Sequence, residues 1–228
     1  MSEDIAARTP WRRHELLRVM PSAWAAALAT RSLGQHPMLS GWADRGWPVI
    51  VRRRIYSDGT MVPVGVPLPP ASAKARVALA LPDDAVIART PLPYLRTLAA
   101  APPRWQPTIA GLLALGERHA VEPAVFGSLL WQHFTGLPYL SEGSDLDLVW
   151  PVHHGHALVL LLDGIDGIER SAPMRIDGEI VFADGAAANW RELRRALSRQ
   201  GSTEVLLKTM EGARFVQVTS LPGCEQIQ

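Results

Sequence analysis

The most constraining feature of this chain is a short alternation of acidic and apolar residues, Asp145-Leu146-Asp147-Leu148-Val149. Side chains along a β-strand point alternately to its two faces, so residues two apart share a face. Asp145 and Asp147 are therefore expected on one face, with Cα atoms about 6.5–7 Å apart, while the leucines pack on the other. The segment predicts a strand, residues 145–152, with one acidic face and one core face.

The second half of the chain alternates predicted strands and helices around this segment. Strands are expected at residues 122–126, 145–152, 175–182, 204–208 and 214–218, and helices at residues 107–120, 129–134, 156–162 and 190–198. This order is typical of an α/β or α+β domain, here a mixed sheet with flanking helices.

The first half also mixes the two kinds of element. Helices are predicted at residues 13–20, 21–33, 71–81 and 94–101, and strands at residues 47–55, 61–66 and 86–88, the first two strands forming a hairpin. Consecutive prolines stop regular structure, so Pro102-Pro103 mark the expected boundary. We therefore expect a smaller N-terminal α+β domain, residues 1–101, and a catalytic domain, residues 102–228.

Charge and composition exclude several classes of protein. The 23 basic and 22 acidic residues nearly cancel, which argues against binding of nucleic acid through bulk charge. The lone cysteine, Cys224, rules out a disulfide framework and a cysteine-based metal site. Residues 1–9 do not resemble a signal peptide, and the longest apolar run, residues 157–162, is too short to cross a bilayer. We expect a cytoplasmic protein with no membrane partner.

The paired aspartates indicate a metal site. Two carboxylates held this close repel each other unless a cation lies between them, and oxygen ligands favour a hard ion such as Mg²⁺. A two-metal site, which serves phosphoryl displacement, needs a third carboxylate. Asp177 is the best candidate, and Glu179, on the same face of the predicted strand 175–182, is the reserve. The simpler alternative for Asp145 and Asp147 is a solvated strand edge.

Several other residues are candidates for phosphate binding. Gly127-Ser128 is expected where a strand turns into a helix, and glycine lets the backbone approach a phosphate at the helix N-terminus. The alternative is a plain helix cap by Ser128. Lys208, on a late strand, could neutralise a triphosphate, although a surface lysine is at least equally expected. Arg52 and Arg53 are further candidates, and at most one of them should face a given ligand.

Together, the Gly127-Ser128 helix start and the Asp145-Leu146-Asp147 strand resemble the nucleotidyltransferase superfamily of the DNA polymerase β type. In that superfamily a later strand supplies a third aspartate, which falls on Asp177. A closer resemblance covers most of the chain. It is to the phosphoribosyl-dephospho-CoA transferase family, the holo-acyl-carrier-protein synthases of malonate decarboxylase, and it is carried by residues 127–132, 135–140, 144–148, 175–179, 184–185 and 190–193, with residues 47–53 and 62–66 in the first half.

The resemblance implies a reaction. A serine of the acyl-carrier subunit of malonate decarboxylase attacks triphosphoribosyl-dephospho-CoA, a phosphodiester forms and pyrophosphate leaves. The family's paired aspartates fall on Asp145 and Asp147. Mg²⁺ bound there would polarise the α-phosphate, and Asp177 would be a third ligand or the general base. Gly127, Ser128 and Lys208 are the expected triphosphate contacts.

Two alternatives remain open from the sequence. The same site could act on another acceptor, such as the citrate lyase carrier, another protein or a small molecule. The chain could also be a binding module that has lost turnover, although such a module would be expected to lose its carboxylates first. The N-terminal domain is expected to recognise the carrier or the dephospho-CoA moiety.

Overall fold

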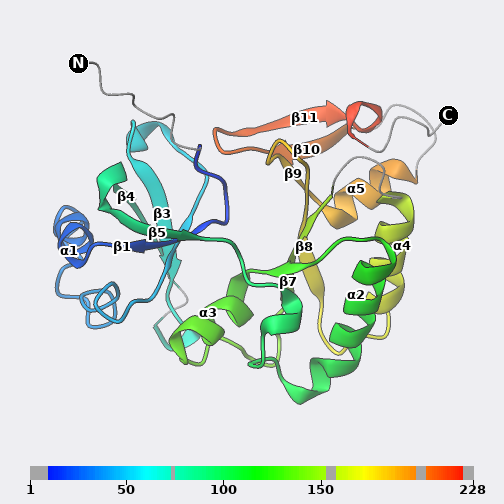
Figure 1. Cartoon of the computed structure of the whole chain (residues 1–228), viewed down its shortest axis with the longest axis horizontal. Helices are drawn as coiled ribbons and strands as arrows, with labels where there is room; N and C mark the ends of the chain where they lie inside the picture. Colours follow the sequence, from blue (N-terminus) through cyan, green and yellow to red (C-terminus); the bar gives the residue numbers. More distant parts are fainter. Residues whose placement is uncertain (1–9, 73–74, 153–157, 199–203, 223–228) are drawn as a thin grey trace.

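A computed structural model describes residues 10–72, 75–152, 158–198 and 204–222. Its strands form two sheets, one from each half of the chain, that lie side by side (Figure 1). The mixed α/β class with an N-terminal α+β part is thus confirmed, whereas the boundary at residue 101 stays a prediction. Residues 1–9, the start of the helix predicted at 156–162, and Cys224 lie outside the described residues.

The N-terminal sheet is antiparallel, with the strand order β4-β3-β2-β1-β5. Its strands are β1 (Leu16–Val19), β2 (Val49–Val51), β3 (Val62–Pro67), β4 (Arg76–Leu81) and β5 (Val86–Thr90). The predicted hairpin of β2 and β3 is confirmed. Helix α1 (Pro21–Ala29) begins at a proline, as predicted, and buries Trp24 and Leu28.

Three predicted helices of this half are wrong. Residues 13–20 contain β1. A short apolar run is compatible with either a buried helix or a buried strand, and here antiparallel pairing with β2 and β5 selects the strand. Residues 71–81 contain β4: alanine favours a helix there, but pairing with β3 along the whole strand outweighs that preference. Residues 94–101 form only one 3₁₀ turn, Leu95–Thr97.

The C-terminal sheet has the order β11-β10-β9-β8-β7-β6. Its strands are β6 (Ala124–Val125), β7 (Leu146–Pro151), β8 (Ile176–Val181), β9 (Ala187–Asn189), β10 (Glu204–Lys208) and β11 (Ala213–Gln217). Only β7 and β8 pair in parallel among the described strands of this sheet. Strand β9, three residues long, is too short to show a periodic pattern and was not predicted.

Four α-helices in the described part of this half accompany the sheet, and their positions decide where a site can form. They are α2 (Gln106–Arg118), α3 (Gly127–Thr135), α4 (Leu158–Glu169) and α5 (Trp190–Leu197). Helices α2, α4 and α5 lie on the far side from the N-terminal sheet, whereas α3 lies between the two sheets (Figure 1). The helices predicted at 107–120, 129–134 and 190–198 are confirmed, and α4 continues beyond the predicted end at residue 162.

The predicted faces of β7 are also confirmed on the packing side, because Leu146, Leu148 and Trp150 are fully buried. The two halves share one continuous apolar core. Trp42 of the N-terminal half packs against Trp131 of α3 with ring centroids 5.8 Å apart. No helix in the described ranges is long and apolar enough to span a membrane.

Candidate active site

The centre of the candidate site is the contact between Asp147 on β7 and the start of α3. Gly127 has φ +67°, in the left-handed region, and a Cβ on it would lie 1.9 Å from Oδ2 of Asp147. The backbone N–H of Ser128 donates to the Asp147 carboxylate. Glycine is therefore required at position 127 for two independent reasons, backbone conformation and space.

Ser128 does not act as the helix cap that the sequence left open. The N-cap residue of α3 is Phe126, and no side chain caps this end of the helix. The main chain of Phe126 donates to the carbonyl oxygen of Asp147 over 3.1 Å, which fixes the helix start to β7. The hydroxyl of Ser128 instead lies on the wall of a cavity.

The charge of Asp147 is poorly compensated. Burial, followed by the negative charges of Asp177 and Asp145, raises the pKa of this carboxyl to about 7. Hydrogen bonding to Ser128 and the charge of Arg76 act in the opposite direction but do not cancel the rise. A carboxylate in this position is stabilised by a cation.

Asp177 lies directly beside Asp147, because the parallel register of β7 and β8 pairs the two residues. Its Oδ1 accepts hydrogen bonds from the main chain of Gly178 over 2.9 Å and from the side chain of Asn189 over 3.1 Å. Arg175 is 3.9 Å from its other oxygen. Asp145, partly buried, immediately precedes β7. The three predicted aspartates therefore belong to the starts of two neighbouring strands, β7 and β8.

Glu179, the reserve third carboxylate, is engaged elsewhere. It is 6% exposed and accepts hydrogen bonds from Arg13 over 2.9 Å and from Lys208 over 3.0 Å, and it contacts His14 over 3.1 Å. Burial by itself would raise the pKa of Glu179, but His14 and Arg13 outweigh it and hold that pKa well below its usual range. Its oxygens already serve three cationic or hydrogen-bonding partners, so Asp177 is the better placed of the two.

Two of the three predicted basic residues, Lys208 and Arg52, have internal carboxylate partners. Lys208 lines the cavity, but its ammonium is bound to Glu179. Arg52 lines it too, yet its guanidinium is bound to the buried carboxylate of Asp58 and helps to hold the turn after β2. Arg53 also lies on the cavity wall and is exposed.

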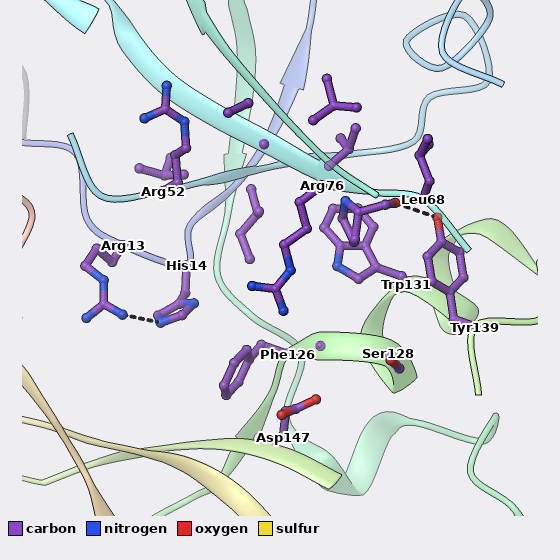
Figure 2. Close-up of a pocket in the computed structure, with 18 of the residues that line it drawn as sticks. Arg13, His14, Arg52, Leu68, Arg76, Phe126, Ser128, Trp131, Tyr139 and Asp147 are labelled. Atoms are coloured by element: carbon purple, nitrogen blue, oxygen red, sulfur yellow. Dashed lines mark hydrogen bonds between the residues drawn. The ribbon is translucent and has the colours of Figure 1, made fainter. Parts of the chain in front are cut away.

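A cavity of about 510 Å³ opens in front of Asp147, between the two halves of the chain. One wall comes from α3 and β7 and carries Gly127, Ser128, Trp131 and Asp147; β2, β3, β4 and the segment before β1 supply the facing wall. Figure 2 shows Asp147 and Ser128 beneath this space and Arg76 reaching into it from β4. Trp131 lines the cavity, whereas Trp190 is buried in the core.

Among the residues of this cavity that sequence reasoning missed are three with nitrogen-bearing side chains, Arg13, His14 and Arg76. The first two lie in the segment predicted as a helix, and Arg76 lies in another. His14 has φ +69°, a strained conformation for a non-glycine residue, and its ring packs against Phe126 at 4.9 Å. No sequence signal separates these residues from other basic residues, because only the pairing of β1 and β4 brings them to the site.

The donor set fits a magnesium ion in kind. Asp145, Asp147 and Asp177 supply only oxygen atoms. Burial, together with the charges of Asp177 and Asp145, raises the pKa of Asp147, and a bound cation would oppose that rise. Within the described ranges, no three acidic or histidine side chains are already gathered as a metal-binding group. Mg²⁺ in proteins is usually bound by one or two carboxylates, and water molecules and substrate phosphates complete its coordination. A site without three gathered carboxylates is compatible with that kind of binding.

Comparison with known proteins matches almost the whole chain. Family models of the phosphoribosyl-dephospho-CoA transferase MdcG match residues 12–91, with the N-terminal domain, and residues 92–219, with the C-terminal domain. No solved structure matches significantly.

Curated relatives carry the same family name. A phosphoribosyl-dephospho-CoA transferase of Bradyrhizobium diazoefficiens is 41% identical over 204 residues, which cover 89% of this chain and 88% of the relative. Those of Xanthomonas campestris pv. campestris and Xanthomonas euvesicatoria pv. vesicatoria are 36% and 34% identical, over 92% of this chain and 95% of each relative. The resemblance found in the sequence is confirmed: the chain belongs to the phosphoribosyl-dephospho-CoA transferase family.

Proposed function

We propose that this transferase moves the 2′-(5″-phosphoribosyl)-3′-dephospho-CoA group from its triphosphoribosyl precursor to a serine of the malonate decarboxylase acyl-carrier subunit. The observation that carries the proposal is the position of Asp147. It lies against a glycine-led helix start, beside Asp177, at the base of a cavity large enough for part of a nucleotide. This is an arrangement suited to phosphoryl transfer.

The reaction exchanges one phosphorus–oxygen bond for another. The serine oxygen bonds to the α-phosphorus as the bond from that phosphorus to the pyrophosphate oxygen breaks. The serine proton passes to a base, and pyrophosphate leaves with the electron pair of the broken bond. Most of the catalysis must come from positioning and from compensation of negative charge.

The residues of the site divide this work. The start of α3, at Gly127 and Ser128, would offer N–H groups and a hydroxyl to the phosphates. Asp145 and Asp147 would hold Mg²⁺, which when bound would polarise the α-phosphate and neutralise the leaving pyrophosphate. Asp177, whose Oδ1 is held by Gly178 and Asn189, would be a third ligand or accept the serine proton.

The apolar part of the cavity wall suits the rest of the substrate. Trp131, Val66 and Val77 line the same cavity as Asp147. A dephospho-CoA moiety has an adenine ring and a flexible pantetheine arm, which could pack against these apolar side chains. We further propose that the reaction takes place in the cytoplasm, since one cysteine in 228 residues is compatible with a reducing compartment.

The test is intact-mass spectrometry of apo carrier subunit from malonate decarboxylase, mixed with this protein, Mg²⁺ and triphosphoribosyl-dephospho-CoA. We expect a mass gain of one phosphoribosyl-dephospho-CoA, its loss with EDTA, and its loss in Asp145→Ala and Asp147→Ala. The matched control is Asp84→Asn, which changes an exposed carboxylate that does not line the cavity.

No mass gain on a carrier verified as unmodified would contradict this acceptor. The same assay with the citrate lyase carrier then tests the second acceptor. Binding of the nucleotide with no product on either carrier would favour the inactive binding module.

A further inference from the structure

Among the described residues, five basic ones line the cavity around Asp147: Arg13, Arg52, Arg53, Arg76 and Lys208. Three of them neutralise carboxylates of the protein itself, since Arg13 and Lys208 bind Glu179, and Arg52 binds Asp58. Their positive charge is already used in the absence of substrate. A polyphosphate entering the cavity needs cationic partners beyond these three.

Arg76 is placed to be such a partner. It is the first residue of β4, paired with Pro67 of β3, and is exposed. Within the part of the chain that the structure describes, its side chain makes no hydrogen bond or ion pair. Figure 2 shows its guanidinium extending from the N-terminal sheet toward Phe126 and Asp147 on the opposite wall.

The electrostatics of the site link Arg76 to the candidate chemistry. The positive charge of Arg76 lowers the pKa of Asp147. The guanidinium therefore interacts electrostatically with the carboxylate at the bottom of the cavity, although the two residues belong to different halves of the chain. Arg53 lines the same cavity, but the charges that act most strongly on Asp147 do not include it. Arg76 is therefore the better candidate for a ligand bound above Asp147.

The chemistry of the ligand follows from what surrounds it. Asp147 at the bottom of the cavity, together with the charges of Asp177 and Asp145 beside it, repels any anion that approaches. One magnesium ion does not balance both these three carboxylates and a triphosphate chain. A guanidinium offers a planar fork of donors that matches two phosphate oxygens at once and stays charged at any physiological pH. A lysine could supply the charge but not the fork.

We propose that Arg76 binds the phosphate chain of the substrate and the leaving pyrophosphate, so that the N-terminal sheet supplies a phosphate-binding residue to the active site. The inference rests on the proposed function for the identity of the substrate. It gives the N-terminal half a direct part in substrate binding, whether or not that half also contacts the carrier.

The experiment measures binding of inorganic pyrophosphate, in the presence of Mg²⁺, to the full-length protein by calorimetry. We expect Arg76→Gln to weaken this binding about tenfold or more and to raise the KM for triphosphoribosyl-dephospho-CoA by a similar factor, since a charged hydrogen-bonding partner is lost. Arg76→Lys should restore part of the affinity. The matched control, Arg118→Gln, removes an exposed arginine from the end of α2 and should change neither quantity more than about twofold.

The outcomes separate this inference from the proposed function. Unchanged pyrophosphate binding and unchanged KM in a folded Arg76→Gln variant would overturn the role of Arg76 while transfer to the carrier continued. Pyrophosphate binding that depends on Arg76, in a protein that modifies neither carrier, would support Arg76 and contradict the function. If Arg76→Gln does not fold, Arg76→Met decides, because full pyrophosphate affinity without the positive charge would contradict the proposal.

Discussion

At the scale of single residues, the site depends on how closely a backbone and a carboxylate approach each other. Gly127 leaves no room for a side chain, because Oδ2 of Asp147 occupies the position of its missing Cβ. Gly136, at the other end of α3, has almost the same φ, +69°, but open space around it. The pair separates the effect of backbone strain from the effect of the lost contact.

We therefore predict different results for alanine at these two positions. Gly136→Ala should cost about 1–2 kcal/mol of stability, the strain of a left-handed residue, and leave transfer unchanged. Gly127→Ala should carry the same strain, displace Asp147 and reduce transfer about 10²-fold. Thermal unfolding and the mass-spectrometric assay measure both effects. Equal activity in the two variants would contradict the role of the Gly127–Asp147 approach.

The raised pKa of Asp147 makes a second prediction, about stability. Between its ordinary pKa of 3.8 and the value of about 7 in the folded protein, the unfolded chain ionises first, so stability falls as the pH rises through this window. Asp147→Asn should remove this loss, raising the Tm at pH 8 without Mg²⁺ by the equivalent of roughly 2–4 kcal/mol. The gain should vanish near pH 4.

Added Mg²⁺ should reverse the order of thermal stability of the unaltered protein and Asp147→Asn at pH 8. Added Mg²⁺ should raise the Tm of the unaltered protein at pH 8 and leave Asp147→Asn almost unchanged, since a ligand stabilises only the form that binds it. Transfer should be lost in Asp147→Asn throughout. A Tm that responds equally in both proteins would show that Asp147 does not hold the ion.

At the scale of elements, β1 and β8 are joined through one carboxylate. Arg13 and His14, just before β1, and Lys208, at the end of β10, all meet at Glu179 on β8. A main-chain hydrogen bond also joins the two halves, because the N–H of Arg54, after β2, donates to the carbonyl of Met210 over 2.8 Å. The N-terminal sheet is thus fixed to the edge of the cavity by a buried ionic cluster.

This cluster predicts acid sensitivity. The pKa of Glu179 is held below its usual range in the folded protein, so its stabilisation is complete above about pH 4.5 and is lost as the pH falls below that value. Glu179→Gln should destabilise the protein by roughly 3–5 kcal/mol at pH 7, since it leaves buried cations without a counter-charge. The difference in Tm between the two proteins should shrink steadily from pH 4.5 downward. A constant difference would contradict the ionic role of Glu179.

At the scale of the whole molecule, the two halves behave as one folded body in their packing. The apolar core runs through both, Trp42 packs on Trp131, and the hydroxyl of Tyr139 donates to the carbonyl of Pro67 over 2.9 Å. The cavity exists only where the halves meet. Folding and formation of the site should therefore be coupled.

Calorimetric unfolding is accordingly expected to give one transition, with equal calorimetric and van't Hoff enthalpies. The nucleotide substrate with Mg²⁺ should shift that whole transition upward, because the lining of the cavity in which we propose that it binds comes from both halves. Two resolved transitions, with only the later or the earlier one moved by the substrate, would contradict this coupling.

The sequence alone determines the elements that have the strongest local patterns. An alternation such as that of residues 145–148 has one packing solution in a strand, and a helix rich in apolar residues at helical spacing, such as α2, forms under most surroundings. The family resemblance rests on such segments. They were sufficient to predict the mixed α/β class and to single out Asp145, Asp147 and Asp177.

Tertiary structure decided what local pattern leaves undetermined. Leu16–Val19 and Arg76–Leu81 became strands because neighbouring strands satisfy their backbone groups, and that pairing is not encoded in either segment. The pairing of those strands brings Arg13, His14 and Arg76 to the cavity that Asp147 lines, although these residues are far from Asp147 in sequence. Which basic residue faces a ligand and which is consumed by an internal carboxylate, as Lys208 is by Glu179, depends on distances across the sheets, and only the folded chain sets them.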